Sequence, residues 1–248
     1  MDNLKNKVVI ITGGNSGIGY ATAKQLKEQG ATVIITGRRK EAIEKVATEL
    51  GVYAIVADQS RISDIENLVL KVKNDFGTVD ILFINAGIAG LGSIEQATEE
   101  LFDNIIDINF KGAFFTLSRF IPILKDGASV VFLSSNTASM PGPGSSIYSS
   151  SKTALNSIMK SAALELAPRK IRVNSVSPDP TETEVMKKVG LDETAVKSIM
   201  DIVVEQKVPL KQMGTASDVA KMVSYISSDA SKFITGANII MDGGMVLA

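Results

Sequence analysis

The chain has 248 residues, no cysteine, no histidine and a formal net charge of -1. The missing cysteines and histidines exclude disulfides, thiolate metal sites and imidazole ligands, and the balanced charge provides no basic field to collect nucleic acid or anionic lipid. Carboxylate sites for Mg²⁺ or Ca²⁺ stay possible, but no stretch has EF-hand spacing and we assign no metal ligand.

Short apolar runs alternate with helical stripes along the chain. Strands are expected at residues 8–12, 32–36, 53–57, 81–84, 130–133, 171–176 and 237–241. Helices are expected after the first strand to about residue 29, at about 43–50, 65–76 and 99–124, around residue 148, and at 217–226, whereas 180–215 shows no strand pattern. This alternation predicts an α/β fold, a mostly parallel, doubly wound sheet with right-handed crossovers. No linker, repeat or charge run divides the chain, so residues 1–248 are expected to form one dinucleotide-binding and catalytic domain.

The first seven residues are polar and charged, and only a five-residue apolar run follows them. This pattern fits neither a signal peptide nor a membrane span. We therefore expect a soluble, cytoplasmic protein.

A glycine-rich turn joins the first expected strand to the helix that follows. Its glycines have the spacing Gly-x-x-x-Gly-x-Gly. In a strand–turn–helix setting such glycines let the backbone approach a pyrophosphate, and the helix N-terminus offers free N–H groups to the phosphates. The turn predicts a dinucleotide-binding site at Gly13, Asn15, Ser16, Gly17, Ile18 and Gly19.

The end of the second expected strand bears on the choice of cofactor. NAD-binding proteins of this kind place an acidic residue there, which binds the ribose hydroxyls. Here Gly37 is followed by Arg38 and Arg39, and two guanidinium groups suit a 2′-phosphate instead. We therefore expect NADP(H) in preference to NAD(H). The alternative is that the two arginines only begin a solvated helix.

Tyr148 and Lys152 are four residues apart, so in a helix they lie one turn apart on the same face. A free phenol has a pKa near ~10, and a lysine ammonium beside it favours the phenolate and lowers that pKa. In a chain without histidine or cysteine, this pair is a way to build a general acid/base that works near neutral pH. The alternative is an ordinary amphipathic helix surface.

Several short motifs follow one another along the chain. They are the turn 12–19, Asn85-Ala86-Gly87, Asn109 in Asn-Phe-Lys-Gly, Ser135, Tyr148-x-x-x-Lys152, Pro178 with Thr183, and the segment 234–244. In this order and spacing they are highly specific, and the chain resembles the classical short-chain dehydrogenase/reductase family over its whole length. The resemblance implies a Rossmann-type sheet of about seven parallel strands with helices on both faces, in a homotetramer or a dimer.

The resemblance also implies a role for each motif. Tyr148 would protonate the substrate oxygen as hydride arrives, and Lys152 would lower the pKa of Tyr148 and bind the nicotinamide ribose. Ser135 would hold the substrate oxygen, and Asn109 would hold a water that links Lys152 to solvent. Residues 88–93 and 136–147 and a lid over about 184–212 would shape the substrate pocket. Further cofactor contacts are implied at Asp58, Gln59, Asn85, Ala86, Gly87, Pro178, Thr181 and Thr183.

Three positions depart from the pattern of the family. Ile84 stands where the family has a second asparagine, and Ser16 stands where many NADP(H) enzymes have a basic residue. Asp179 stands where the family has glycine, so it places a carboxylate and a Cβ close to the nicotinamide. The charge or the backbone shape of the site is expected to differ at this point.

The expected reaction interconverts a carbonyl and a secondary alcohol of a free small molecule, with no nucleic-acid or membrane partner. Use of NAD(H) remains an alternative. A second alternative is a 3-oxoacyl-thioester reductase of fatty acid synthesis, in which two arginines dock the acyl carrier; Arg169 matches one position, but Asp126 stands near the other. A third is a catalytically silent, dinucleotide-binding regulatory protein, although such proteins are expected to lose the tyrosine or the lysine.

Overall fold

The centre of the fold is a seven-stranded sheet. The computed structural model describes residues 4–182 and 193–248. The strand order is β3-β2-β1-β4-β5-β6-β9, and each neighbouring pair is parallel. The strands are β1 Val8–Thr12, β2 Thr32–Gly37, β3 Tyr53–Val56, β4 Val79–Ile84, β5 Leu124–Leu133, β6 Arg172–Pro178 and β9 Asn238–Met241. The expected doubly wound, parallel sheet is confirmed.

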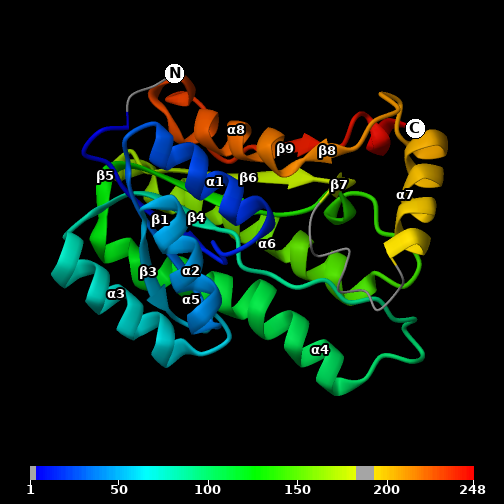
Figure 1. The fold of residues 1–248 in the computed structure, drawn as a ribbon, viewed down its shortest axis with the longest axis horizontal. Coiled ribbons are helices and arrows are strands. Elements are labelled where there is room, and N and C mark those ends of the chain that lie inside the picture. Colours follow the sequence, from blue (N-terminus) through cyan, green and yellow to red (C-terminus); the bar gives the residue numbers. More distant parts are fainter. Residues whose placement is uncertain (1–3, 183–192) are drawn as a thin grey trace.

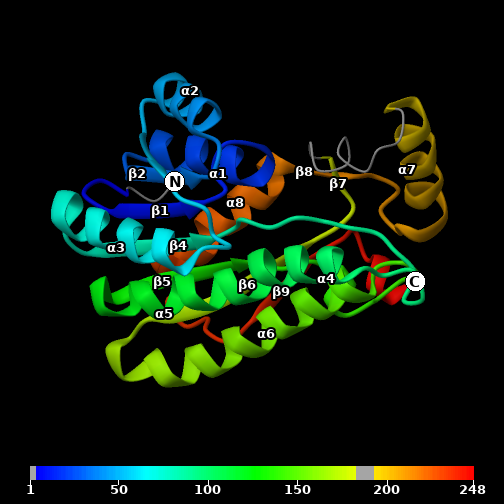
Figure 2. The ribbon, with the colours of Figure 1, turned by 90° about the horizontal axis from the view of Figure 1, so that it is seen from below.

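Helices cover both faces of this sheet (Figures 1 and 2). On one face lie α1 Gly17–Glu28, α2 Lys40–Leu50 and α8 Ala216–Ser227; on the other lie α3 Ile62–Phe76, α5 Ala113–Phe120 and α6 Ser146–Leu166, with α4 Glu99–Ile106 beside α6. Successive strand residues point to opposite faces, so Ile10 packs with the second set of helices and Ile11 with the first. Both faces are therefore apolar, which explains why the strands read as continuous hydrophobic runs.

The winding of the chain reverses between β1 and β4, which are neighbours in the sheet. In sheets of this kind the loops after two such strands leave in opposite directions, and the crevice between them is where ligands bind. The loops that carry the predicted motifs after β1 and β4 are thus brought to one place.

The helical stretch expected over residues 99–124 is continuous as far as Ile123, but it is not one uniform α-helix. After α4 the chain makes a π-helical turn, Asp107–Gly112, before α5 begins, and a 3-10 turn, Ile121–Ile123, ends it. A Cβ added at Gly112 would lie 2.1 Å from the carbonyl oxygen of Gln59, so the helix is packed directly on the loop after β3. Pro122 lies in the 3-10 turn, where proline ends a helix because it lacks an N–H, and β5 then begins at Leu124, earlier than expected.

The segment in which no strand pattern was expected contains regular structure. A helix, α7 Glu193–Lys207, stands beyond the carboxyl ends of the central strands (Figure 1). Two short strands, β7 Thr181–Glu182 and β8 Gly214–Thr215, pair with each other outside the main sheet. The lid expected over 184–212 thus includes α7, while its first part, 184–192, lies outside the described residues.

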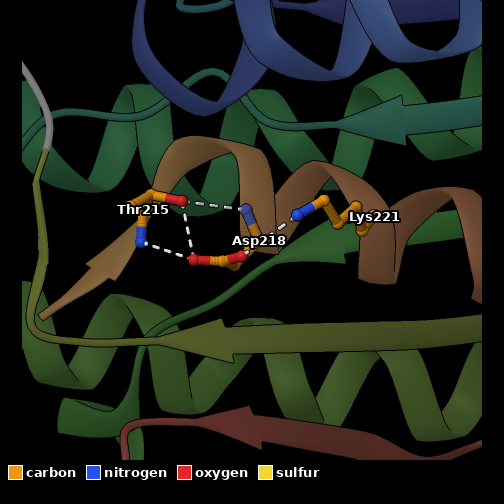
Figure 3. A network of polar contacts seen from close by, with 3 residues as sticks. All are labelled: Thr215, Asp218 and Lys221. Atoms are coloured by element: carbon orange, nitrogen blue, oxygen red, sulfur yellow. Dashed lines mark hydrogen bonds and ion pairs between the residues drawn. The ribbon is translucent and has the colours of Figure 1, made fainter. Parts of the chain in front are cut away.

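Helix α8 begins with a capping box (Figure 3). The Thr215 hydroxyl accepts the N–H of Asp218 at 3.2 Å, and the Asp218 carboxylate accepts the N–H of Thr215 at 3.1 Å. These reciprocal bonds satisfy N–H groups that have no partner within the helix. The Thr215 hydroxyl also donates to the Asp218 carboxylate at 2.6 Å, and this bond and then the bond from the Thr215 N–H lower the pKa of Asp218. The cap fixes the point at which the chain turns from β8 into the helix that supports β5 and β6.

None of the helices in the described ranges, 4–182 and 193–248, has the length and apolar character needed to cross a membrane.

Candidate active site

A cleft with a volume of about 700 Å³ lies at the carboxyl ends of the central strands. The predicted site residues that line it are Gly13, Asn15, Ser16, Gly17, Ile18, Arg38, Arg39, Asp58, Gln59, Asn85, Ala86, Gly87, Tyr148, Lys152, Pro178 and Thr181. Gly19, Asn109 and Ser135 are buried beside the cleft and contact residues that line it. Thr183 lies outside the described residues.

The turn after β1 is tied to the turn after β4. The hydroxyl of Thr12 accepts the N–H groups of Asn85 and Ala86 at 3.0 and 2.9 Å, and the Asn85 amide donates to the carbonyls of Thr12 and Gly13 at 2.8 and 3.0 Å. A Cβ on Gly19 would lie 2.3 Å from the Gly13 carbonyl oxygen, so only glycine lets α1 approach this closely. Ile84, the departure noted above, is buried in the core, and Thr12 and Asn85 make the polar contacts between the two turns.

The first turn of α1 and the cleft around it have donors and acceptors that suit a dinucleotide. The side chain of Ser16 makes no capping hydrogen bond, so the first N–H groups of α1 stay available to an anion. Two buried oxygen atoms of residues that line the cleft, Gln59 Oε1 and Thr181 Oγ1, have no hydrogen-bond partner in the described chain. Buried polar atoms are rarely left unpaired, so both fit a site completed by a polar ligand.

Arg38 and Arg39 lie at the rim of the cleft, directly after β2. Both are exposed, and within residues 4–182 and 193–248 neither side chain has an ion pair or a hydrogen bond. Nothing described therefore neutralises the two guanidinium groups at the end of the strand where a ribose phosphate is expected.

Asn109 lies in the π-helical turn and is fully buried. Its Oδ1 accepts the N–H of Ile88 at 2.8 Å, its Nδ2 donates to the Ile88 carbonyl at 2.8 Å, and Nδ2 is 3.3 Å from Ser151 Oγ. The amide thus holds the loop that follows β4 against the Tyr148 helix, α6. These contacts fix the position of the Asn109 side chain. The water-holding role that the resemblance implies for Asn109 stays a prediction.

Tyr148 and Lys152 both project from α6 into the cleft. The Lys152 ammonium lies 5.7 Å from the centre of the Tyr148 ring and donates to the Leu133 carbonyl at 2.9 Å. Burial lowers the pKa of Lys152 to about 8, and the charge of Asp179 opposes this shift. Lys152 is therefore only partly protonated in mildly alkaline solution.

The pKa of Tyr148 differs from the sequence-based expectation. We expected Lys152 to lower it, but burial and then the charge of Asp179 raise it above the ordinary value, and hydrogen bonding by Ser135 offsets only part of the rise. The cause is the tertiary environment, since the Lys152 ammonium is hydrogen-bonded to Leu133 and an anionic side chain lies in the same cleft. Tyr148 is therefore a protonated phenol at neutral pH, ready to donate a proton.

Asp179, the position where the family has glycine, is in contact with Ser135. Its carboxylate accepts a short hydrogen bond from the Ser135 hydroxyl. Burial raises the pKa of Asp179, Ser135 and Lys152 act to lower it, and Asp242 raises it. The sequence marked this position as unusual, but it did not indicate that Ser135 is its partner.

The part of the cleft next to α7 and the C-terminal segment is lined by residues that the sequence did not single out. Met200 and Val203 reach it from α7, within the expected lid, and Met245 reaches it from the C-terminal segment. Met245 is brought there because Gly243 and Gly244, with φ of 63° and 90°, turn the chain back after β9. The glycine pair after the last strand was the signal available in the sequence.

A family model, known protein sequences and a solved structure each match nearly the whole chain. A family model described as enoyl-(acyl carrier protein) reductase matches residues 13–246. Dehydrogenase/reductase SDR family member 4 of Homo sapiens is 35% identical over 251 residues, covering 98% of this chain and 88% of that protein. Versicolorin reductase stcU of Emericella nidulans is 33% identical over 253 residues, covering 97% and 96%. A crystal structure of a short-chain dehydrogenase/reductase from Brucella melitensis, described as SDR:glucose/ribitol dehydrogenase, superimposes with a TM-score of 0.92 at 31% identity, covering 99% of each chain.

Proposed function

Because the chain belongs to the short-chain dehydrogenase/reductase family, we propose that it is an NADP(H)-dependent oxidoreductase that interconverts a carbonyl and a secondary alcohol of a small molecule. One observation carries this proposal: Tyr148 and Lys152 line the same cleft as the glycine-rich turn that begins at Gly13. A proton donor and a site suited to a dinucleotide thus face one cavity, as a reaction that moves a hydride and a proton together requires.

The protein's part in the reaction is to position the substrate and to move a proton. A bound nicotinamide would supply or accept the hydride. Tyr148 donates its phenolic proton to the substrate oxygen in reduction and takes it back in oxidation. Because burial raises the pKa of Tyr148, the protein favours the protonated phenol, which is the form that reduction needs.

Lys152 stabilises the phenolate that forms when Tyr148 has given up its proton. Its ammonium lies over the Tyr148 ring at 5.7 Å from the centroid and is held in place by the Leu133 carbonyl. An opposite charge at this range favours the ionised phenol within a buried site. The same ammonium can contact the cofactor ribose, because Lys152 lines the cleft.

The structure gives no support for docking of an acyl carrier through Arg169. That guanidinium pairs with Asp126 at 2.8 Å and donates to the carbonyls of Ile121 and Leu124. Its donors are used to close the turn that leads into β5. A free small molecule is therefore the favoured substrate.

The proposal is tested by nicotinamide absorbance with NADPH and NADH in parallel, across ketones, aldehydes, diketones and β-ketoacyl thioesters. We expect turnover with NADPH on one class of carbonyl. If NADPH binds and no carbonyl of the panel is turned over, the reductase proposal fails and a silent, dinucleotide-binding regulatory protein takes its place.

Replacement of both Arg38 and Arg39 by alanine is expected to weaken NADPH binding about 10- to 100-fold and to leave NADH binding within about twofold. Hydrogen bonds from a charged donor to a phosphate contribute roughly 1.5–3 kcal/mol, and only NADPH has the 2′-phosphate. Isothermal titration of the whole protein with each nucleotide measures the difference. Arg61→Ala is the matched control, because Arg61 is also exposed and lies outside the cleft. An equal loss for both nucleotides would contradict the assignment.

A further inference from the structure

Asp179 introduces an anionic group into the cleft at the end of β6. Among the described residues no cation lies within ion-pair distance of its carboxylate. The cation that acts on it, Lys152, donates a hydrogen bond to the Leu133 carbonyl instead. The specific polar contact that the structure gives to this carboxylate is the hydroxyl of Ser135.

The Ser135 hydroxyl has one proton to donate and two lone pairs that can accept. The N–H of Thr137 donates to its oxygen at 3.1 Å, and the Thr137 hydroxyl lies 2.8 Å away. Its one proton goes to Asp179. Ser135 also lies where it can hydrogen-bond Tyr148, but an ionised carboxylate is the stronger acceptor. While Asp179 is ionised, Ser135 therefore has no proton left for a substrate oxygen.

The exposure of Asp179 and Ser135 also indicates that a substrate oxygen meets the carboxylate before the hydroxyl. Asp179 lines the cleft, whereas Ser135 is only 1% exposed and lies behind the residues that line it. A substrate oxygen that enters the cleft thus meets a carboxylate next to the hydroxyl that is expected to hold it.

Charged and titratable groups face Asp179 from each neighbouring element. Tyr148 and Lys152 lie on α6, and Asp242 follows β9. The pKa of Asp179 is raised by burial and by Asp242, against the opposing effects of Ser135 and Lys152. At a given pH the neutral carboxylic acid is therefore more populated at Asp179 than at an ordinary aspartate.

We propose that Asp179 is a positioning residue for the proposed reaction, and that its protonation frees the Ser135 hydroxyl to hold the substrate oxygen. A proton from solvent binds the Asp179 carboxylate, and the new O–H donates to Ser135 Oγ. The Ser135 proton, no longer needed by Asp179, turns toward the substrate. This inference rests on the proposed function, and it makes reduction depend on an ionisation that a glycine at this position cannot provide.

The first test is the pH profile of kcat/KM for carbonyl reduction. The Asp179→Asn variant keeps the shape of the side chain, can donate to Ser135 and cannot ionise. We expect the wild-type value to fall about tenfold for each pH unit above the Asp179 ionisation, and the variant to lack this limb. In a Ser135→Ala background, Asp179→Asn is expected to change the profile no further. Asp75→Asn, which alters an exposed carboxylate on α3, is the matched control and should keep the wild-type limb. The same limb in wild type and Asp179→Asn would overturn the proposal.

The second test needs no turnover. Carbon-13 resonances of aspartate carboxyls are titrated by NMR in the full chain, and the Asp179 signal is the one missing from Asp179→Asn. We expect its pKa above the ordinary ~3.9, and higher still in Ser135→Ala, because the Ser135 hydrogen bond stabilises the carboxylate. An ordinary pKa that Ser135→Ala leaves unchanged would overturn the inference even in an active enzyme. If Asp179 titrates as expected but the protein turns over no carbonyl, the result would count against the proposed function and not against the link between Asp179 and Ser135.

Discussion

Replacement of Tyr148 by phenylalanine is expected to reduce kcat for carbonyl reduction by about 10²–10⁴-fold, the range that general acid catalysis contributes. The ring and its packing stay, and only the hydroxyl that donates the proton is lost. The chain contains no histidine or cysteine to replace it. Steady-state kinetics with saturating NADPH measures the loss.

Two comparisons separate the loss of a proton donor from damage to the fold. NADPH binding to Tyr148→Phe, followed by titration calorimetry, should stay within a few-fold of wild type. Tyr225→Phe changes an exposed tyrosine on α8 and should leave kcat unchanged. A Tyr148→Phe enzyme with wild-type kcat would show that the proton comes from another group, and Asp179 would be the first to consider because it also lines the cleft.

Replacement of Gly112 by alanine is expected to destabilise the protein by about 1–3 kcal/mol, the usual effect of overpacking a filled site. The added Cβ would lie 2.1 Å from the Gln59 carbonyl oxygen and 2.9 Å from the Asp107 carbonyl oxygen, both of which are backbone atoms. For a chain of this size the melting temperature should fall by roughly 2–4 °C per kcal/mol.

The destabilisation expected for Gly112→Ala is opposite in sign to the usual effect of this substitution within a helix. In an ordinary helix interior, glycine to alanine stabilises by up to about 1 kcal/mol. Gly142→Ala is the control, because a Cβ at Gly142 has nothing within 4 Å and its φ lies outside the left-handed region. Thermal denaturation of both variants should lower the melting temperature of Gly112→Ala only. An unchanged or higher melting temperature for Gly112→Ala would show that the π-helical turn is not packed on Gln59 as described.

The parts of the fold that were predictable have local causes. Residues 8–12 read as a strand because every side chain is apolar or β-branched, and the glycine-rich turn with its helix follows at once. The parallel sheet then follows from the alternation of strands and helices. The π-helical turn was not predictable, because it depends on contact between Gly112 and Gln59, which are far apart in the sequence.

The sequence predicted which residues meet at one cleft and marked Asp179 as a change in its charge, but it did not predict the direction in which the pKa of Tyr148 is shifted. Most of the predicted residues line one cleft, because parallel strands bring their carboxyl-end loops together. The spacing of Tyr148 and Lys152 said nothing about burial or about an anion supplied from β6. Both effects are tertiary, and together they give the pKa of Tyr148 the opposite sign of shift from the one expected.

The position of helix α7 also depends on tertiary contacts that the sequence pattern does not reveal. Residues 180–215 mix polar and apolar side chains, and only the structure shows a helix there that turns Met200 and Val203 toward the cleft. Their contact with the cleft is set by the approach of the helix to the end of the sheet, which the helical pattern does not encode.

Deuterium transfer tests the central claim most directly. The whole protein is incubated for a single turnover with a carbonyl substrate and NADPH deuterated at the transferring position of the nicotinamide, and the alcohol is examined by mass spectrometry. The account predicts one deuterium on the carbinol carbon with wild-type protein and almost none with Tyr148→Phe over the same time. Alcohol formed without deuterium, or NADPH bound with no deuterium reaching any carbonyl of the panel, would contradict it.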